Sequence, residues 1–186
     1  MKYLVYGSRE LGRVVRGLLD VCGLEFVGFI DDIHTGSDIL GPFEQVVRTF
    51  RPDDYMLVNA VGYANLAVRK QISGRILSKG YSTPCIIHPA ASIAPSAKIG
   101  VGSIIMAQAV IDFEAVLGEM VVLWPGAVVN HDARIGENTF LSPNCTICGG
   151  AVIGANSFVG AGAVVADHRT VPDDTFLKAN STWTER

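Results

Sequence analysis

A histidine beside a carboxylate is the strongest candidate for acid–base chemistry in this sequence. His131 and Asp132 lie in the segment VNHDARIG, residues 129–136. An imidazole titrates near neutral pH and can take a proton from an attacking amine or hydroxyl, and a carboxylate at its second ring nitrogen fixes the tautomer. His131 is therefore a candidate general base with Asp132 as its orienting partner. The alternative is an exposed surface histidine without a catalytic role.

A second set of polar residues follows two predicted strands in the first half of the chain. A strand over 2–7 runs into the turn Gly7-Ser8-Arg9-Glu10-Leu11-Gly12, a helix is predicted over 11–22, and a strand over 25–30 ends in Asp31-Asp32. This order is typical of a nucleotide-binding βαβ unit, in which a phosphate or another polar group meets the helix N-terminus and the carboxylate accepts hydrogen bonds from a ribose or a base. The predicted substrate contacts are Gly7, Ser8, Arg9, Gly12, Asp31 and Asp32. A tight strand-to-helix turn that binds nothing is the alternative.

A further strand and a helix complete the first half. Residues 56–60 are predicted as a buried strand, and a helix that carries Arg69 and Lys70 is predicted to start near Asn65. With the elements before them they form a small Rossmann-like α/β domain over residues 1–84.

An internal repeat with a period of six residues dominates the second half. One aliphatic residue stands at each sixth position, and all thirteen such positions are filled in register: Ile93, Ile99, Ile105, Ile111, Leu117, Leu123, Val129, Ile135, Leu141, Ile147, Ile153, Val159 and Val165. An amphipathic helix does not fit, because its turn of 3.6 residues would place every sixth residue on drifting faces. The residue after the aliphatic one is often glycine, as at 100, 118, 136, 154 and 160. The residue four positions after the aliphatic one is usually small.

Such a six-residue unit describes one flat side of a triangular coil, with three units in each turn. The aliphatic residues are predicted to stack inside the coil, and the glycines that follow them are predicted to take positive φ. We therefore expect a parallel β-helix over residues 85–172 and a C-terminal tail over 173–186. His131 occupies a position that does not stack inside the coil, so its ring should point outwards.

Composition and charge exclude several classes of protein. The net charge is −3 over 186 residues, which leaves no basic excess with which to bind nucleic acid. The apolar run at the N-terminus is too short for a signal peptide or a membrane span, so a cytoplasmic protein with reduced thiols is expected. Cys145 and Cys148 form a C-x-x-C pair, but both fall in slots that small residues fill in other repeats, which favours a structural role.

The hexads resemble those of the hexapeptide-repeat acyltransferases, whose coils wind left-handed. Over the whole chain, the βαβ unit, Val61-Gly62 with Arg69 downstream, and the entry segment Ile87-His88-Pro89-Ala90 are similar to the sialic acid O-acetyltransferase-like family, which includes bacterial nucleotide-sugar N-acetyltransferases. The resemblance implies that the first domain holds the nucleotide of a nucleotide-linked aminosugar. It also implies that the β-helix holds acetyl-CoA between neighbouring subunits of a homotrimer, with no metal.

The same resemblance assigns roles to residues. His-Asp followed by Ile-Gly matches the family's catalytic segment, which implies that His131 is the base and Asp132 its partner. Similarity also indicates backbone amides around Gly149, next to Gly150, as the oxyanion donor, and Gly160-Ala161 as part of the CoA groove. A plain repeat-glycine role is the alternative for these positions. Glu10 and Leu11 depart from the family, which commonly has Gly and His there.

Two functions fit these sequence features, and a third is excluded. The first is an acetyl-CoA-dependent acetyltransferase that acts on the amino group of a nucleotide-linked amino-dideoxysugar, with sugar O-acetylation of the sialic-acid type as its near alternative. The second is a non-catalytic trimeric scaffold that binds a sugar nucleotide. The third, a zinc enzyme of the carbonic anhydrase type, needs three converging histidines, commonly two of them five residues apart. It is rejected because positions 126 and 136 are glycine.

Overall fold

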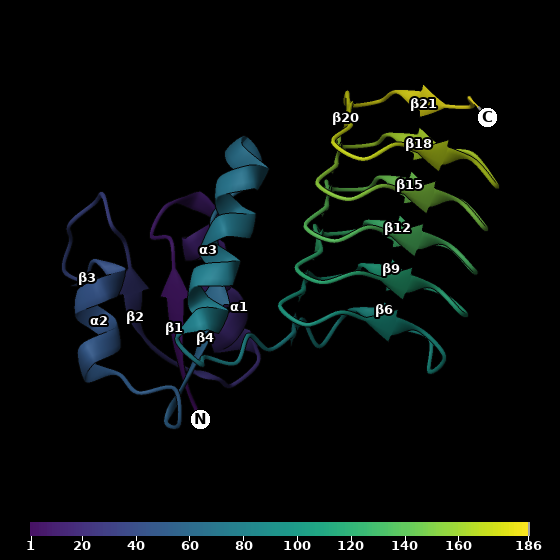
Figure 1. The fold of residues 1–186 in the computed structure, drawn as a ribbon. Coiled ribbons are helices and arrows are strands. Elements are labelled where there is room, and N and C mark those ends of the chain that lie inside the picture. The colour runs from purple at the N-terminus through teal and green to yellow at the C-terminus, as the bar shows by residue number, and fades with distance from the viewer. Residues whose placement is uncertain (186) are drawn as a thin grey trace. The chain divides into compact units, whose positions relative to one another are not determined.

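The chain forms two compact units that follow one another along the sequence (Figure 1). The structure, a computed structural model, describes residues 1–185. The first unit runs from Met1 to Pro84, and the second begins at Cys85. None of the helices in the described part of the chain has the length and apolar character needed to cross a bilayer.

The first unit is an α/β unit built on a parallel sheet of four strands in the order β3-β2-β1-β4. Its elements are β1 Lys2–Tyr6, α1 Glu10–Val21, β2 Glu25–Ile30, β3 Ile39–Gly41, α2 Phe43–Thr49, β4 Tyr55–Asn59, the 3₁₀ turn η1 Tyr63–Asn65 and α3 Leu66–Ser78. The predicted strands and helices agree with β1, α1, β2, β4 and α3 to within a residue or so. The short β3 and α2 were not predicted.

Apolar spacing explains why these segments adopt their structures. Leu11, Val15, Leu18 and Leu19 form the buried face of α1, which packs against β1 and β2. Such i, i+4, i+7 spacing is what an amphipathic helix on a sheet requires. Helix α3 starts where the Asn65 side chain accepts a hydrogen bond from Val68 N at 3.0 Å, an N-cap.

The second unit is a parallel β-solenoid of about five coils, made of two-residue strands. Every strand pairs with strands one coil away, so that Val116 faces Arg134 and Val122 faces Phe140, 18 residues apart. Three hexads therefore close one turn, as predicted. The strands are β5 Ile86–Ile87, β6 Ser92–Ile93, β7 Lys98–Ile99, β8 Ile104–Ile105, β9 Val110–Ile111, β10 Val116–Leu117, β11 Val122–Leu123, β12 Val128–Val129, β13 Arg134–Ile135, β14 Phe140–Leu141, β15 Thr146–Ile147, β16 Val152–Ile153, β17 Phe158–Val159, β18 Val164–Val165, β19 Thr170–Val171, β20 Phe176–Leu177 and β21 Thr182–Trp183.

The aliphatic residues of the repeat form the interior of this solenoid. From Ile105 to Val165 they are all buried in one cluster, and Ile93 and Ile99 pack against its first coil. The small residues of the repeat, such as Ala109 and Ala127, are buried beside them. This packing confirms the internal column that the period of six predicts.

The glycines after the aliphatic residues have a different reason from the one predicted. Positive φ is not found at Gly100, Gly118, Gly136, Gly154 or Gly160; a Cβ there would instead lie 2.3–2.7 Å from backbone atoms of the next coil. Positive φ occurs two residues later, at every sixth residue from Gly102 to Asn180, for example at Asp132 and Asn144. Asn, Asp, His and Gly tolerate this conformation best, which explains their frequency at those positions.

The segment 173–186 was predicted as a tail, but its described residues, 173–185, continue the coil. Strands β20 and β21 lie in it, Leu177 is buried, and Trp183 packs against the core in the slot that follows Val171 and Leu177 at intervals of six. The ring of Phe176 also stacks on Phe158 with centroids 4.8 Å apart. Val171, Leu177 and Trp183 keep the period of six, so the repeat extends past residue 172, where the prediction ended it.

Candidate active site

The candidate base lies on one edge of the solenoid, which we call the His131 corner. It consists of the turns that follow β9, β12, β15 and β18, residues 112–114, 130–132, 148–150 and 166–168. Because one coil is 18 residues long, His131, Gly149 and Asp167 stand in one column at this corner, and Asp132, Gly150 and His168 stand in the next.

The His131 side chain is exposed and paired with Asp132. Its relative exposure is 58%, and Nδ1 lies 3.0 Å from Oδ2 of Asp132. The positive φ of Asp132 brings the carboxylate back towards the ring of the preceding residue. With Nδ1 held by the carboxylate, Nε2 is the nitrogen left to exchange a proton with a bound acceptor.

Nearby carboxylates favour the protonated form of this histidine. The hydrogen bond to Asp132 raises the pKa of His131 above its ordinary value, and the charges of Asp132, Asp112 and Asp167 add to the effect. A base with a raised pKa holds the abstracted proton more firmly. The pair can therefore accept a proton near neutral pH and return it to a leaving group.

Two glycines make room for two histidines at this corner. A Cβ on Gly149 would lie 2.6 Å from Cε1 and Nε2 of His131, and one on Gly150 would lie 2.4 Å from Nδ1 of His168. His168 thus also belongs to this corner, because its ring lies against Gly150, next to the Gly149 that the His131 ring contacts. The 18-residue spacing was the signal that could have placed it here.

The backbone amides predicted to donate to an oxyanion already have acceptors. Gly149 N donates to Oδ1 of Asp167 at 3.0 Å, and Gly150 N donates to the carbonyl oxygen of His131 at 2.9 Å. The Gly150 bond belongs to the ladder between coils, whereas the Gly149 bond goes to an exposed side chain. Gly149 N is therefore the amide that a ligand could take over. Asp167 was not predicted as part of this site.

The other predicted cofactor residues lie on a different edge of the solenoid. Gly160 and Ala161 belong to the turn after β17, whereas Gly149 and Gly150 follow β15. Gly160 N donates to Leu177 O within the ladder, and a Cβ on Gly160 would lie 2.4 Å from Ala179 N. Within one chain the two glycine segments are thus not brought together at one corner.

In the first unit, Gly7 and Gly12 are required by close backbone packing. Gly7 has φ +105° and a Cβ there would lie 2.9 Å from Ala60 O, while a Cβ on Gly12 would lie 2.0 Å from Gly7 O. The turn thus needs glycine at both positions whether or not a ligand binds. Arg9 is exposed at the start of α1, which has no side-chain N-cap.

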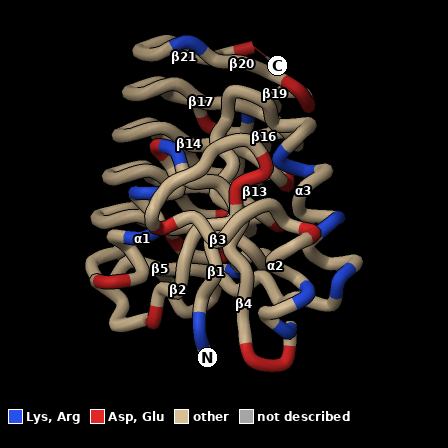
Figure 2. Tube along the Cα trace, turned by 90° about the vertical axis from the view of Figure 1, so that its left-hand side faces the viewer, with Lys and Arg blue, Asp and Glu red and all other residues tan. Residues whose placement is uncertain are grey.

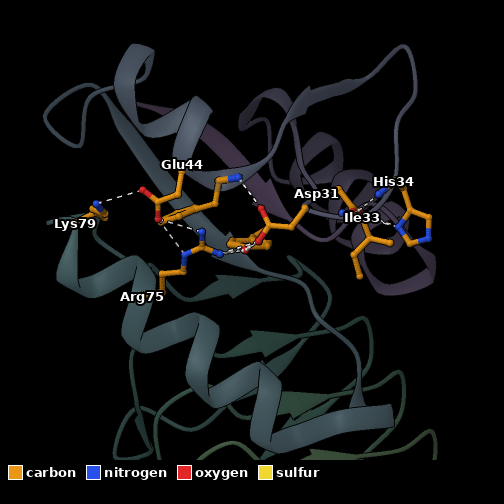
Figure 3. Close-up of polar contacts among 9 residues, drawn as sticks. Asp31, Ile33, His34, Glu44, Arg75 and Lys79 are labelled. Carbon is orange, nitrogen blue, oxygen red and sulfur yellow. Dashed lines mark hydrogen bonds and ion pairs between the residues drawn. The ribbon is translucent and has the colours of Figure 1, made fainter.

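Asp31 accepts hydrogen bonds from other residues of its own chain, and Figure 3 shows its contacts with Ile33 and His34. Its oxygens accept from Ser8 Oγ at 2.5 Å, from Ser8 N at 3.2 Å and from the backbone N of Ile33 and His34 at 2.9 Å each. The His34 ring adds a contact of 3.1 Å. Burial alone would raise the pKa of Asp31, but these hydrogen bonds outweigh it and hold the pKa well below its usual range. Asp31 therefore holds the Gly7–Gly12 turn.

Asp32 belongs to a second charged network in the same unit. It accepts from Tyr6 Oη at 2.5 Å, from Phe43 N at 2.7 Å and from Arg75 at 2.7 Å. Arg75 in turn bonds Glu44 at 3.0 Å and lies over the Phe43 ring. Burial raises the pKa of Tyr6, and its bond to Asp32 raises it further. Tyr6 and Arg75 were not recognised from the sequence because their partners are distant along the chain.

Neither a thiol site nor a metal cluster is found in the described residues. Burial raises the pKa of Cys145 to about 12 and also raises that of Cys148, with Asp167 adding to the second shift, so both remain thiols at neutral pH. In residues 1–185 no three His, Cys, Asp or Glu side chains are grouped so that they could hold an ion. Lys and Arg are dispersed along the trace in Figure 2 and do not form one basic band in that view.

The fold and the corner together define a class of protein. A family model described as bacterial transferase hexapeptide (six repeats) matches residues 114–149 and 132–167, which include His131 and Gly149. A search of curated protein sequences gives no significant match.

Solved structures resemble the chain over almost its whole length. The acetyltransferase domain of PglB from Neisseria gonorrhoeae is 31% identical, with a TM-score of 0.92, 98% of this chain covered and 91% of that one. The same domain in complex with acetyl coenzyme A gives 30% identity, a TM-score of 0.90 and coverage of 98% and 92%. A mutant of GDP-perosamine N-acetyl transferase from Caulobacter crescentus, in complex with CoA and GDP-perosamine, gives 25%, a TM-score of 0.80, and 96% and 93%. The chain thus belongs to the bacterial hexapeptide-repeat acetyltransferases of which this PglB domain is a member, and it is an acyltransferase.

Proposed function

We propose that this protein transfers an acetyl group from acetyl-CoA to the amino group of a nucleotide-linked amino-dideoxysugar. The observation that carries the proposal is the exposed His131–Asp132 pair against Gly149, in a chain that is 31% identical to an acetyltransferase domain over nearly its full length. The solved complexes of relatives with acetyl coenzyme A, and with CoA and GDP-perosamine, support the choice of donor and acceptor.

In the proposed reaction the acceptor nitrogen attacks the thioester carbonyl carbon while His131 Nε2 takes a proton from that nitrogen. The carbonyl oxygen gains negative charge, which a hydrogen bond from Gly149 N–H stabilises. The C–S bond then breaks as the C=O bond re-forms, and the CoA sulfur leaves with the proton that His131 had taken. The products are an N-acetylated sugar and free CoA. Asp132 keeps the imidazole oriented and stabilises its charged form.

The first unit is proposed to hold the nucleotide, in a Rossmann-like arrangement. Its strand order β3-β2-β1-β4 is that of the first four strands of a doubly wound dinucleotide fold, which supports the proposal. Arg9, exposed at the beginning of a 12-residue helix without a side-chain cap, could meet a phosphate. Asp31 and Asp32 contribute indirectly, because their oxygens hold Ser8, Phe43 and Arg75 in place.

The complete site is proposed to form between subunits of a homotrimer. Gly149 and Gly160 lie on different edges of one solenoid, so a single ligand that contacts both needs a neighbouring copy to bring the second edge to the first. Closed three-fold symmetry repeats this contact three times. The coil is proposed to wind left-handed, as in the hexapeptide-repeat acyltransferases.

Two alternatives remain to be distinguished by experiment. A sugar hydroxyl can replace the amine, because the same base removes its proton. A non-catalytic scaffold would bind the sugar nucleotide without turnover, but it gives no reason for the exposed pair that faces Gly149.

The test is acetyl transfer by the full chain, measured as release of the CoA thiol with a panel of nucleotide-linked sugars that carry either a free amine or only hydroxyls. His131→Ala should lower the rate by about two to four orders of magnitude, the usual weight of a general base. His168→Asn, which tolerates the positive φ at that position, serves as the matched variant. An equal loss in both variants, or none in His131→Ala, would remove His131 as the base.

A further inference from the structure

We propose that Asp167 occupies the oxyanion-binding amide of Gly149 in the free enzyme and must release it before the thioester oxygen can bind there. Asp167 is then an internal competitor of the acyl donor and a determinant of how strongly the enzyme distinguishes acetyl-CoA from CoA. The inference rests on the proposed function, because it takes Gly149 N–H as the donor to the thioester oxygen.

The Gly149 amide stands outside the backbone ladder between coils. At the His131 corner Asp132 N donates to Phe113 O, Gly150 N to His131 O and His168 N to Gly149 O, all at 2.9 Å. These bonds tie successive coils together. Gly149 N donates instead to Oδ1 of Asp167 at 3.0 Å, so this amide can change partners without opening the ladder.

The amide of Gly149 and the candidate base His131 lie next to each other. A Cβ on Gly149 would lie 2.6 Å from Nε2 of His131, so the ring stands against this residue. An acyl group attacked beside that ring has its carbonyl oxygen within reach of the same corner. Asp167 is exposed, so its side chain can turn into solvent at little packing cost.

Asp167 and the thioester oxygen would compete for the same N–H group. An ionised carboxylate and a developing oxyanion are both acceptors, and Gly149 offers one backbone N–H. While Asp167 holds that N–H, the thioester oxygen has no donor from this residue and meets a negative charge instead. Free CoA lacks the thioester carbonyl oxygen, so its affinity should depend on Asp167 far less than that of acetyl-CoA.

The chain contains a matched control on another edge of the solenoid. Asp173 Oδ1 accepts from Ala155 N at 2.7 Å, with the same separation of 18 residues as Asp167 and Gly149. It joins neighbouring coils at the turn after β19, away from the His131 corner. If Asp167 were only a bond between coils, the two aspartates should behave alike.

The experiment is calorimetric titration of acetyl-CoA and of CoA into the wild-type full chain and into Asp167→Asn, Asp167→Ala and Asp173→Asn. Removing the competing charge should tighten acetyl-CoA binding about 3- to 10-fold, the equivalent of one net hydrogen bond, with little change for CoA. Asp167→Asn should lie between wild type and Asp167→Ala, since an amide oxygen is a weaker acceptor. Asp173→Asn should leave the ratio of the two affinities as in wild type.

A second readout is the pH dependence of the rate. The charged or titratable groups around His131 are Asp132, Asp112 and Asp167, with His168 beside Gly150. Removal of the Asp167 charge should move the acidic limb of kcat/KM to lower pH, because one of the charges that favour the imidazolium is lost. Asp173→Asn should leave that limb in place.

The outcomes separate this inference from the proposed function. An unchanged or lower ratio of acetyl-CoA to CoA affinity in Asp167→Ala, with an unaltered melting temperature, overturns the competitor role. Absence of acetyl-CoA binding and of turnover in the wild-type protein overturns the proposed function instead. Equal changes in ratio for Asp167→Asn and Asp173→Asn show a general effect on the coil and also overturn the inference.

Discussion

At the scale of single residues, the His131 corner shows how a repeat of fixed length gathers groups that are far apart in the chain. His131, Gly149 and Asp167 follow one another at intervals of one coil. The His131 ring lies against Gly149, and the Asp167 carboxylate accepts a hydrogen bond from Gly149 N. The side chains of His131 and Asp167 are both exposed, so neither is needed to fill the core. Residues at this corner can therefore be selected for their chemistry without loss of core packing.

Asp132→Asn should change the pH dependence of acetyl transfer in a defined direction. The hydrogen bond to Asp132 is the largest cause of the raised pKa of His131, and the base must be neutral to act. Its loss lowers that pKa, so the acidic limb of kcat/KM should move to lower pH. The plateau rate should also fall, because the ring loses its orienting partner. Rates measured across the neutral range check this; an unmoved limb would show that Asp132 does not act on His131.

Asp31→Asn should destabilise the first unit more at neutral pH than in acid. Asp31 is buried, and its lowered pKa means that its stabilising contribution is complete above the unfolded value of 3.8 and is lost progressively as the pH falls from there through the folded pKa. We expect a loss of about 2–3 kcal/mol at pH 7, the range for hydrogen bonds to a charged group. The difference between variant and wild type should shrink below about pH 4.

Urea titration followed by circular dichroism at 222 nm is the suitable measurement, because helices α1, α2 and α3 all lie in the first unit. Both tryptophans lie in the second unit, so their fluorescence provides an internal control that should not change. A difference that stays constant down to pH 3 would contradict the assignment.

At the scale of elements, the contrast between two glycines of α1 tests how the turn and helix are packed. A Cβ on Gly12 would meet Gly7 O at 2.0 Å, whereas one on Gly17 meets nothing within 4 Å. Gly12→Ala should therefore cost about 2–3 kcal/mol through overpacking. Gly17→Ala should stabilise by about 0.5–1 kcal/mol, because alanine is the better helix former. Thermal unfolding followed by circular dichroism at 222 nm measures the change in stability of each variant. A Gly12→Ala variant as stable as wild type would show that the turn between β1 and α1 can widen to hold a Cβ.

The elements also show where pattern reading succeeds. The bounds of α1 and β2 follow from a long apolar period and from a run of apolar residues closed by two aspartates. β3 and α2 escaped because each is short: β3 has three residues, and α2 begins directly after Pro42 with only Phe43 and Val46 buried. Such segments are stabilised by the sheet and the Asp32 network more than by their own sequence.

At the scale of the whole molecule, assembly should be required for activity. Light scattering should give the mass of a trimer, and a monomer with full activity would contradict a site between subunits. Ala161→Trp, at an exposed position beside Gly160, should block the second edge of that site. It should be inactive alone, as should His131→Ala.

Co-expression of these two variants should restore activity. Three quarters of randomly mixed trimers contain both chains, and each of these has one intact site of three, so about a quarter of wild-type activity is expected. If the two segments served one ligand within the same chain, co-expression would restore nothing. Wild type mixed with Asp173→Asn controls for the effect of mixing itself.

The sequence alone determined the solenoid, its coil length and the outward position of His131, because an in-register period of six over many coils has few physical solutions. It also determined the first unit's main strands and helices through apolar spacing. Only the tertiary structure decided that Asp31 and Asp32 hold their own chain, that the repeat glycines serve close approach of coils, and that Asp167 and His168 stand at the His131 corner. Most of those contacts join residues 18 or more positions apart, and they are set by packing in three dimensions, which local propensity does not reveal.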